Sequence, residues 1–336
     1  VIVMYKGKIV ECGTAASIFK NPQEEYTKAL IYARPSTKER LERLPTVADF
    51  LNQKPMAPAV SEAVRTAKHQ KLYSKTPLLE IKNARKEYYS NVSFFGKKET
   101  IKAVNDVSFK IYEGETLGLV GESGCGKSTL GNLILQLDQV TSGHIFYQGT
   151  DLTRLKTRDL RKLRRDIQII FQDPYSSLNP RLTVGQAITE AMEVHKLYAS
   201  KKERKAEALK LLEQVGLLPE HYDRYPHEFS GGQRQRIGIA RTIAVKPKFI
   251  VCDESVSALD ISVQAQVLNL LNTLKEEYNF TYLFISHDLA VVKYISDRLL
   301  VMRNGQFEET GEADAVYAAP QSDYTQALIN AIPKGI

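Results

Sequence analysis

Apolar and polar positions change their spacing several times along the chain, and the spacing predicts most of the regular elements. Residues 78–88 and 104–112 alternate between apolar and polar side chains, which is typical of half-buried strands. Four shorter, predominantly apolar runs have the length of buried strands: 116–120, 167–171, 249–252 and 282–285. Apolar residues recur at helical spacing in 130–137, 184–195, 201–215 and 263–274. Buried strands alternating with helices predict an α/β fold with a mostly parallel sheet covered on both faces.

A repeat of 35 residues links the two ends of the chain. Residues 1–35 align without a gap on residues 299–333, with identity at fifteen positions. Each copy has the pattern of strand, turn, strand, turn and a helical stretch interrupted by proline. Because the second copy closes a domain, we expect the first copy to be the tail of a preceding domain that is missing here. Its apolar side chains would cover the absent core: Ile2, Met4, Ile18, Phe19, Leu30 and Ile31.

The segment between the first copy and the strand at residue 78 has the character of a linker. It contains four prolines and no strand pattern, which predicts a linker over 36–77 with one or two short helices. Residues 36–75 hold eight Lys and Arg against four Asp and Glu. We interpret this charge as a solvated surface; contact with anionic lipid or nucleic acid is the alternative.

Composition narrows the class of protein. A chain of 336 residues with 43% hydrophobic and 25% charged side chains can form two domains, or one large α/β domain with attachments. No run reaches the roughly 18 apolar residues of a membrane span. Three scattered cysteines favour neither disulfides nor a metal–thiolate site and fit a reducing compartment. The basic run at 161–165 lacks interleaved aromatic residues, so no nucleic-acid partner is expected.

A glycine-rich loop after the strand at 116–120 contains the first candidate binding residues. The residues match the P-loop pattern: Gly121, Glu122, Ser123, Gly124, Cys125, Gly126, Lys127, Ser128 and Thr129. The glycines let backbone N–H groups converge on phosphate oxygens at the start of a helix. We expect Lys127 to meet the β- and γ-phosphates of ATP and Ser128 to ligate Mg²⁺.

Two acids follow the apolar strand at 249–252. Asp253 is placed to hold Mg²⁺, directly or through water. Glu254 can act as general base toward the attacking water. Surface acids after a strand would be an ordinary alternative, but a P-loop in the same chain favours the catalytic interpretation.

A second anion-binding element lies at Ser230, Gly231, Gly232 and Gln233, at the predicted start of a helix. One ATP does not need two such elements, whereas two domains arranged head to tail do. With this segment the sequence resembles the ATP-binding subunits of ABC transporters over about residues 78–333. The resemblance implies a P-loop ATPase with an antiparallel β subdomain and a helical subdomain at about 173–240.

The resemblance assigns further residues. Gln172 matches the glutamine that contacts Mg²⁺ and the attacking water, and His287 matches the histidine that faces the γ-phosphate. Asp260 matches an aspartate at the interface between paired domains. Tyr88 stands where an aromatic residue stacks on adenine, with Tyr89 as a competitor. Lys127, Gln172, Glu254 and His287 are thus the expected catalytic residues, and Ser128, Gln172 and Asp253 the expected Mg²⁺ ligands.

Two further segments resemble the oligopeptide and dipeptide importer subfamily. One is the Asp-Pro-Tyr-Ser-Ser-Leu-Asn-Pro-Arg run at 173–181, and the other is the closing Pro-Gln-x-x-Tyr-Thr pattern at 320–325, within an extension at about 312–336. Ser255 departs from the proline usual after the catalytic glutamate. The chain would then comprise the tail of an ABC ATPase domain (1–35), a linker (36–77) and a complete nucleotide-binding domain (78–336).

The resemblance implies an ATPase that energises an importer at the cytoplasmic face of the membrane. Expected partners are a second ABC ATPase domain fused upstream, membrane permease subunits and an extracytoplasmic solute-binding protein. Peptides are the expected solute, with nickel, glutathione and oligosaccharides left open. A soluble ABC ATPase of translation or DNA repair is the alternative, but it predicts a long charged helical linker or a coiled-coil insertion. A regulatory domain without hydrolysis is opposed by Lys127, Glu254 and His287.

Overall fold

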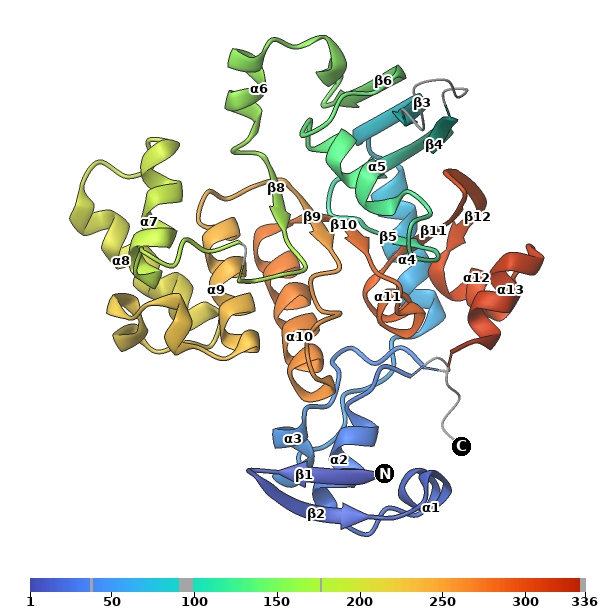
Figure 1. Ribbon diagram of the computed structural model, residues 1–336, viewed down its shortest axis with the longest axis vertical. Coiled ribbons are helices and arrows are strands. Elements are labelled where there is room, and N and C mark those ends of the chain that lie inside the picture. Colours follow the sequence, from blue (N-terminus) through green and yellow to red (C-terminus); the bar gives the residue numbers. More distant parts are fainter. Residues whose placement is uncertain (37–38, 91–98, 176, 333–336) are drawn as a thin grey trace.

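The centre of the molecule is a six-stranded sheet, shown in Figure 1. The computed structural model describes residues 1–36, 39–90, 99–175 and 177–332. In spatial order the strands are β12 (Gln306–Glu312), β11 (Arg298–Arg303), β5 (Thr116–Val120), β10 (Thr281–Ile285), β9 (Phe249–Asp253) and β8 (Ile167–Ile170). Every neighbouring pair is parallel except β11 and β12. The prediction of a mostly parallel α/β sheet is therefore confirmed.

Both faces of this sheet are buried, and successive residues of each strand enter different cores. Ile250 and Cys252 of β9 belong to one core, while Phe249 and Val251 belong to the other. The first core also contains side chains of α9 (Gly231–Ile243), α10 (Ile261–Tyr278) and α11 (Leu289–Ile295). The second contains those of α5 (Lys127–Ile134). Burial on both faces explains why these strands are continuous apolar runs rather than alternating ones.

A second, antiparallel sheet covers α5 in the upper part of Figure 1. Its strands are β4 (Glu99–Tyr112), β3 (Pro77–Ser90), β6 (Ser142–Tyr147) and β7 (Thr150–Asp151), in that spatial order. Helix α6 (Thr157–Leu163) connects it to β8. The alternating pattern that predicted β3 and β4 reflects a sheet with one face in the core.

Helices gather at one end of the central sheet, at the left of Figure 1. They are α7 (Val184–Val194), α8 (Lys201–Gln214) and the start of α9, and α7 contacts both of the others. A capping box between Thr183 and Gln186 starts α7. The segment that joins β8 to α7 contains Ser176, which lies outside the described residues.

The two copies of the sequence repeat fold into the same unit. The N-terminal unit comprises β1 (Ile2–Tyr5), β2 (Lys8–Cys12), α1 (Ala15–Lys20) and α2 (Glu25–Tyr32). The C-terminal unit comprises β11, β12, α12 (Ala313–Ala318) and α13 (Asp323–Asn330). Each hairpin has an irregular register at the same step, Val3/Met4 in one and Val301/Met302 in the other. Pro333, the last residue of the second copy, lies outside the described residues.

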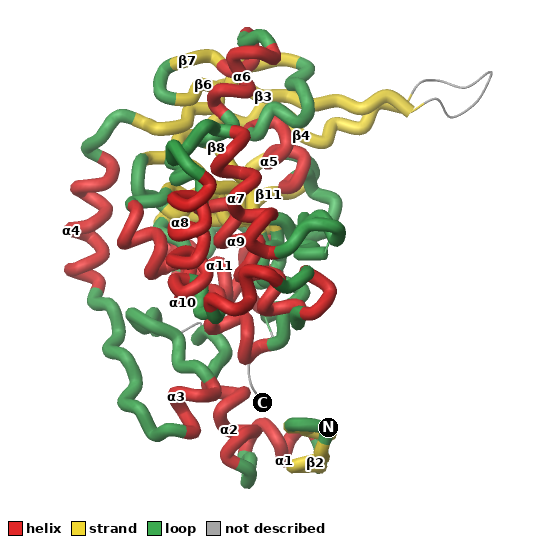
Figure 2. Tube along the Cα trace, turned by 90° about the vertical axis from the view of Figure 1, so that its left-hand side faces the viewer, coloured by secondary structure: helices red, strands yellow, loops and turns green. Residues whose placement is uncertain are grey.

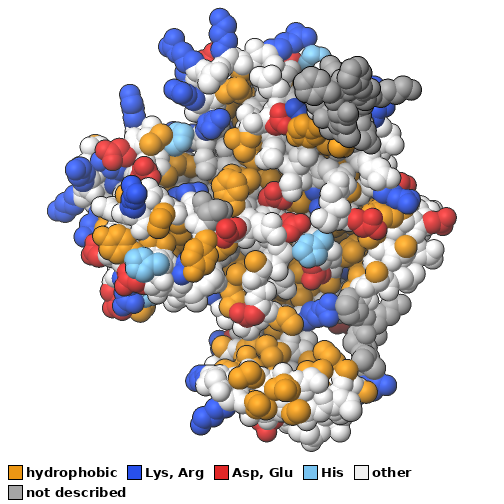
Figure 3. Space-filling view, viewed as in Figure 1, with side chains coloured by type: hydrophobic (Ala, Val, Ile, Leu, Met, Phe, Trp, Pro, Cys, Tyr) orange, Lys and Arg blue, Asp and Glu red, His pale blue; other side chains and the backbone are white. Residues whose placement is uncertain are grey.

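The N-terminal unit stands apart from the central sheet, at the bottom of Figures 1 and 2. Strands β1 and β2 form a sheet of their own. Apolar side chains therefore gather on the surface of this unit, as the space-filling view in Figure 3 shows. The large exposed ones are Val1, Ile2, Met4, Ile9, Phe19 and Tyr32.

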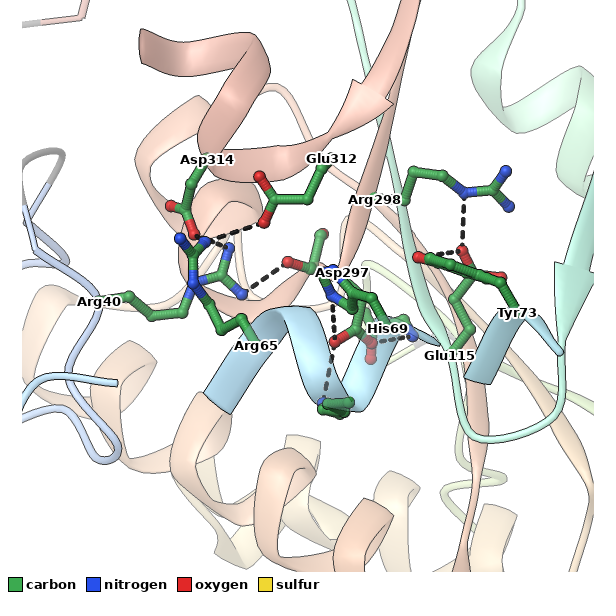
Figure 4. Close-up of polar contacts among 12 residues, drawn as sticks. Arg40, Arg65, His69, Tyr73, Glu115, Asp297, Arg298, Glu312 and Asp314 are labelled. Carbon is green, nitrogen blue, oxygen red and sulfur yellow. Dashed lines mark hydrogen bonds and ion pairs between the residues drawn. The ribbon is translucent and has the colours of Figure 1, made fainter. Parts of the chain in front are cut away.

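The linker segment between the N-terminal unit and β3 runs along the domain and is fixed to it by ion pairs. It contains α3 (Val47–Leu51) and α4 (Glu62–Tyr73), which Figure 2 shows along one side of the molecule. Arg40 and Arg65 both pair with Asp314 of α12, and Lys68 pairs with Asp297 before β11, as Figure 4 shows in part. The side chains of Arg40 and Arg65 are only 13% and 18% exposed. The interpretation of this charge as solvated is therefore wrong for these two arginines, because folding brings acids of the distant C-terminal unit beside them.

None of the helices in the described ranges is both long and apolar enough to cross a membrane.

Candidate nucleotide-binding and catalytic site

The P-loop lies where the central strand β5 ends and α5 begins. Gly121 has φ of 151° and Gly126 has φ of 113°, and a Cβ at either would lie 2.1 Å from a backbone oxygen, of Met302 or Ala103 respectively. These two positions therefore require glycine. Ser123 and Gly124 lie at the exposed turn of the loop, and Cys125 is buried beneath it. The loop wraps closely around the start of a helix, as a phosphate site requires.

Lys127 is the first residue of α5, and its side chain folds back over the loop. The ammonium group donates to the carbonyl oxygens of Gly121 and Glu122, at 2.8 Å in each case. The residue is 5% exposed. A positive charge is thus held against the first turn of the loop, close to where a lysine would meet phosphate oxygens bound by the loop.

Ser128 and Asp253 meet between the P-loop helix and the end of β9. The Ser128 hydroxyl donates to Oδ1 of Asp253 at 3.1 Å. Burial raises the pKa of Asp253 above its usual range, although the Ser128 hydrogen bond and the Lys127 charge oppose the rise. Hydroxyl and carboxylate oxygens are the donors that Mg²⁺ prefers, and a nearby cation would stabilise this carboxylate. The predicted pair is therefore brought together by the fold.

Two predicted catalytic side chains converge on one carboxylate oxygen of a third. Gln172 donates from Nε2 to Oε2 of Glu254 at 2.9 Å, and Nδ1 of His287 lies 3.4 Å from the same oxygen. Gln172 follows β8, Glu254 follows β9 and His287 follows β10, and these strands are parallel neighbours. Parallel strands end at one edge of the sheet, so the residues after them become neighbours.

The backbone of Glu254 is held in an unusual conformation. Its φ is 47°, in the left-handed region that non-glycine residues rarely adopt. Its N–H donates to the carbonyl oxygen of Ile285 at 2.9 Å, and the Ser257 hydroxyl donates to its carbonyl oxygen at 2.8 Å. These two hydrogen bonds hold the backbone of Glu254 in this conformation, and the backbone conformation sets the direction of the side chain. Sequence reasoning assigned Ser257 only to the segment that matches the interface between paired domains and did not predict this contact with Glu254.

Tyr88 and Tyr89 lie at the end of β3, and only Tyr88 contacts the P-loop region. The Tyr88 hydroxyl donates to Oδ2 of Asp138 at 2.7 Å, whereas the Tyr89 hydroxyl donates to Glu87 at 3.2 Å. The Asp138 hydrogen bond is the main cause that raises the pKa of Tyr88, and the Thr129 side chain of the P-loop opposes it. Tyr88 is therefore the better placed of the two to contact a nucleotide on this loop.

The Ser230–Gln233 segment forms the start of α9 and is separate from this chain's own P-loop. Ser230 and Gln233 make a capping box, in which each side chain accepts the other residue's backbone N–H, at 3.4 and 3.0 Å. Gly232 is in close contact with α10, since a Cβ there would lie 2.4 Å from Val263. Across the described residues, Ser230 and Gly231 make no hydrogen bond with the P-loop. Asp260 caps the start of α10 and is exposed.

The structure adds a P-loop contact that sequence reasoning missed. The hydroxyl of Tyr324, on α13, accepts the backbone N–H of Glu122 at 3.1 Å. Tyr324 is the tyrosine of the closing Pro-Gln-x-x-Tyr-Thr pattern and is identical to Tyr26 in the repeat. The repeat was therefore a signal that this tyrosine has a specific role, although it did not indicate where the side chain lies.

Comparisons with known proteins agree with this geometry. The family described as "ABC transporter" matches residues 104–257. The family described as "Oligopeptide/dipeptide transporter, C-terminal region" matches twice, at residues 10–55 and 309–335, so it covers parts of both copies of the repeat.

Two relatives illustrate the extent of the similarity. The oligopeptide transport ATP-binding protein OppF of Bacillus subtilis is 54% identical over 257 residues, which are 76% of this chain and 82% of OppF. The glutathione import ATP-binding protein GsiA of Escherichia coli K12 is 44% identical over 339 residues, which cover 99% of this chain. The chain spans about half of GsiA, 53% of its length.

A solved structure supports the fold. The ATP-binding cassette MJ0796, in a dimeric structure bound to ADP and Pi, matches 70% of this chain and 98% of its own, with a TM-score of 0.63 and 31% identity. The fold, the P-loop and the relatives all lead to the same assignment. This chain belongs to the ABC transporter ATP-binding proteins of the oligopeptide transporter type, and it is an ATPase of that family.

Proposed function

We propose that this protein binds and hydrolyses ATP to energise the import of peptides through a membrane permease. The observation that carries the proposal is the convergence of Gln172 and His287 on the carboxylate of Glu254, beside an intact P-loop. The names of the relatives favour peptides as the solute, since OppF and its Streptococcus mutans counterpart are oligopeptide transport proteins. Glutathione, itself a tripeptide, is the second candidate because the match to GsiA extends over almost the whole chain.

Each side chain in the site has a definite task in this proposal. Residues 121–129 and the ammonium of Lys127 bind the phosphates, and Tyr88 stacks on adenine. Glu254 accepts a proton from the attacking water as general base. Gln172 orients that water, and His287 donates toward the γ-phosphate.

Mg²⁺ fits the oxygen donors of Ser128 and Asp253, which the fold brings together, and Gln172 is proposed as a further ligand. Ser128, Asp253 and Gln172 offer oxygen donors, and the Asp253 carboxylate is partly buried with a raised pKa, so a nearby cation would stabilise its charge. Bound there, the metal would neutralise developing charge on the phosphate oxygens. The chain contributes the fixed oxygens at the ends of α5 and β9.

The segment Ser230–Gln233 is proposed to complete the ATP site of a second ABC ATPase domain, with Asp260 at the interface between the two. Its separation from this chain's own P-loop supports that role. The dimeric structure of MJ0796 shows that a similar cassette can pair.

The second domain is proposed to be fused upstream, so that residues 1–35 are its tail, 36–77 the linker and 78–336 the complete nucleotide-binding domain. The match of an oligopeptide transporter C-terminal region to residues 10–55 supports this organisation. The sequence encoded upstream of Val1 tests it. We expect a P-loop and a signature serine within about 300 residues, on the scale of one further large domain, and an unrelated upstream sequence would contradict the fusion.

An importer ATPase of this family works with membrane permease subunits. We propose that the helical region at about 173–240 contacts them at the cytoplasmic face of the membrane. An extracytoplasmic solute-binding protein would deliver the peptide from the other side.

The substitution Glu254→Gln tests the catalytic assignment. It should lower steady-state phosphate release by roughly 10²–10⁴-fold, because it removes a general base. ATP binding should persist, since Lys127 and the loop amides are intact, whereas Lys127→Ala should weaken binding itself. Phosphate release by Glu254→Gln within about threefold of the wild-type rate, well short of the loss of a general base, would contradict the role of Glu254.

A further inference from the structure

Tyr324 provides the side-chain contact of α13 with the P-loop, beside the 2.9 Å hydrogen bond that the Gly305 N–H of the same unit donates to the carbonyl oxygen of Cys125. The hydroxyl of Tyr324 accepts the backbone N–H of Glu122, the second residue of the P-loop, at 3.1 Å. The tyrosine is 9% exposed, and the guanidinium of Arg303 lies 4.8 Å from the centre of its ring. A buried ring with a cation on it has little freedom to follow a moving loop.

The helix that carries Tyr324 is itself fixed to the sheet. The carboxylate of Glu309, on β12, accepts the backbone N–H groups of Gln321 and Ser322 at 2.9 and 3.1 Å. The Ser322 hydroxyl then accepts the N–H of Tyr324 at 3.2 Å and caps α13. The position of Tyr324 is therefore set by the central sheet through β12.

Glu122 is held from two sides. Its N–H is bound by Tyr324, and its carbonyl oxygen accepts the ammonium of Lys127 at 2.8 Å. These contacts fix the direction of the two peptide planes on either side of Glu122. The following N–H groups of the loop, which must converge on phosphate, start from these planes.

We propose that Tyr324 is a positioning residue for ATP binding, so that the oligopeptide-type C-terminal unit forms part of the nucleotide site. It holds the first turn of the P-loop in the conformation that receives phosphate. The inference rests on the proposed function, in which this P-loop binds ATP. Tyr324 acts through the loop and touches no reacting atom.

The repeat provides a matched control within the same chain. Tyr26 is the equivalent residue of the N-terminal unit, and its ring packs on Tyr5 with the ring centres 4.2 Å apart, where Tyr324 packs on Arg303. In the described parts of the chain, Tyr26 makes no hydrogen bond with the P-loop. Tyr26→Phe should therefore leave nucleotide binding unchanged.

The experiment compares Tyr324→Phe with Tyr26→Phe in the full chain. Calorimetric titration with ATP and with inorganic tripolyphosphate, both with Mg²⁺, measures the affinity of the loop for phosphate. Tyr324→Phe should weaken both by about three- to tenfold, the scale of ordering a flexible group at a binding site. The KM for ATP should rise while kcat changes little.

Stability measurements separate positioning from simple packing. Because Glu122 is exposed, water can replace the lost acceptor, and the nucleotide-free melting temperature of Tyr324→Phe should stay within about 2 °C of the wild-type value. Tyr324→Leu, which also loses the ring, should melt lower. If packing alone matters, only Tyr324→Leu will differ from wild type, which overturns the inference.

The remaining outcomes distinguish this inference from the function on which it rests. Wild-type affinity of Tyr324→Phe for both ligands, with normal binding by the wild-type protein, overturns the positioning role alone. Absence of ATP binding by the wild-type protein overturns the proposed function and this inference together. Tyr88→Ala should weaken the binding of ATP but not that of tripolyphosphate. If Tyr324→Phe likewise loses affinity for ATP alone, its effect is on binding of the adenine base, which also contradicts the inference.

Discussion

The N-terminal and C-terminal units have the same local structure and opposite surroundings. Both have a hairpin with a turn glycine at φ of 78°, Gly7 and Gly305, preceded by a residue with φ near 50°. Both also have a glutamate on the second strand, Glu11 or Glu309, that binds two backbone N–H groups before the last helix. The units differ in what covers them. Strand β11 pairs with β5 in the central sheet, whereas among the described strands β1 pairs only with β2.

Side chains at equivalent positions of the two units differ in their exposure to solvent. Met302 is fully buried, while Met4, the same residue at the same place, is 58% exposed. The opposite holds on the last helix, where Ala29 of α2 is buried against the α3 side of the linker and its equivalent Ala327 of α13 is exposed. The local sequence therefore specifies the unit, and burial comes from neighbouring parts of the chain that are present for one copy and not for the other.

Truncation of the two methionines should give the largest contrast between the units. Met302→Ala leaves a cavity between the central sheet and the antiparallel sheet, and we expect a loss of about 2–5 kcal/mol in unfolding free energy. Met4→Ala removes an exposed side chain, and its effect should stay within about 0.5 kcal/mol. Urea unfolding of both variants measures the contrast. A large loss for Met4→Ala would mean that the N-terminal hairpin is covered in solution, for example by a second copy.

Two acids at the junction of β12 and α12 distinguish the units in a second way. Asp314 and Glu312 face Arg40, Arg65 and Lys293, whereas the equivalents of the two acids in the N-terminal unit are Ala16 and Thr14. This cluster has more cations than anions, and burial followed by the charges of both arginines lowers the pKa of Lys293.

Asp314→Ala should therefore destabilise the protein by about 3 kcal/mol, because it leaves largely buried cations with fewer partners. Limited proteolysis should then cut within 39–75 first, since this segment depends on the pairs. Glu25→Ala is the control from the N-terminal unit. Its carboxylate is 66% exposed, and Lys28 is the one cation that pairs with it in the part of the chain that the structure describes, so Glu25→Ala should leave the unfolding midpoint unchanged. Equal stability of wild type and Asp314→Ala would mean that the ion pairs do not hold the linker.

The features that could be predicted from the sequence depend on short segments of the chain. The contacts that could not be predicted join segments far apart in the sequence. The P-loop and the acids after β9 could be recognised because each lies within a few residues of a buried strand. Gln172 and His287 required the family resemblance, and the order of parallel strands explains why they meet. The contact between Tyr324 and Glu122 joins residues 202 positions apart, and that between Arg65 and Glu312 joins residues 247 apart. No local pattern specifies such pairs, so the charge of the linker was interpreted as solvated.

The smallest expected effect concerns the pKa values of Glu11 and Glu309, which should be lowered in both units alike. The backbone N–H of Gln23 lowers the pKa of Glu11. Burial raises the pKa of Glu309, but the N–H groups of Gln321 and Ser322 together with the Thr325 side chain outweigh it, and the pKa is again below the usual value. Each carboxyl group accepts both hydrogen bonds most strongly when it is ionised. The stabilisation should thus be complete above the ordinary glutamate pKa of about 4.3 and lost as the pH falls through the lowered value.

Carbon-13 NMR titration of the glutamate carboxyl groups measures this directly, with the urea-unfolded chain as the reference for each residue. We expect both Glu11 and Glu309 to titrate below their unfolded values. A lowered value for Glu309 alone would mean that the contact between the second strand and the last helix needs the central sheet. In that case the N-terminal unit would not keep the structure of its C-terminal counterpart without a sheet of its own, and the local sequence would be insufficient to specify the unit.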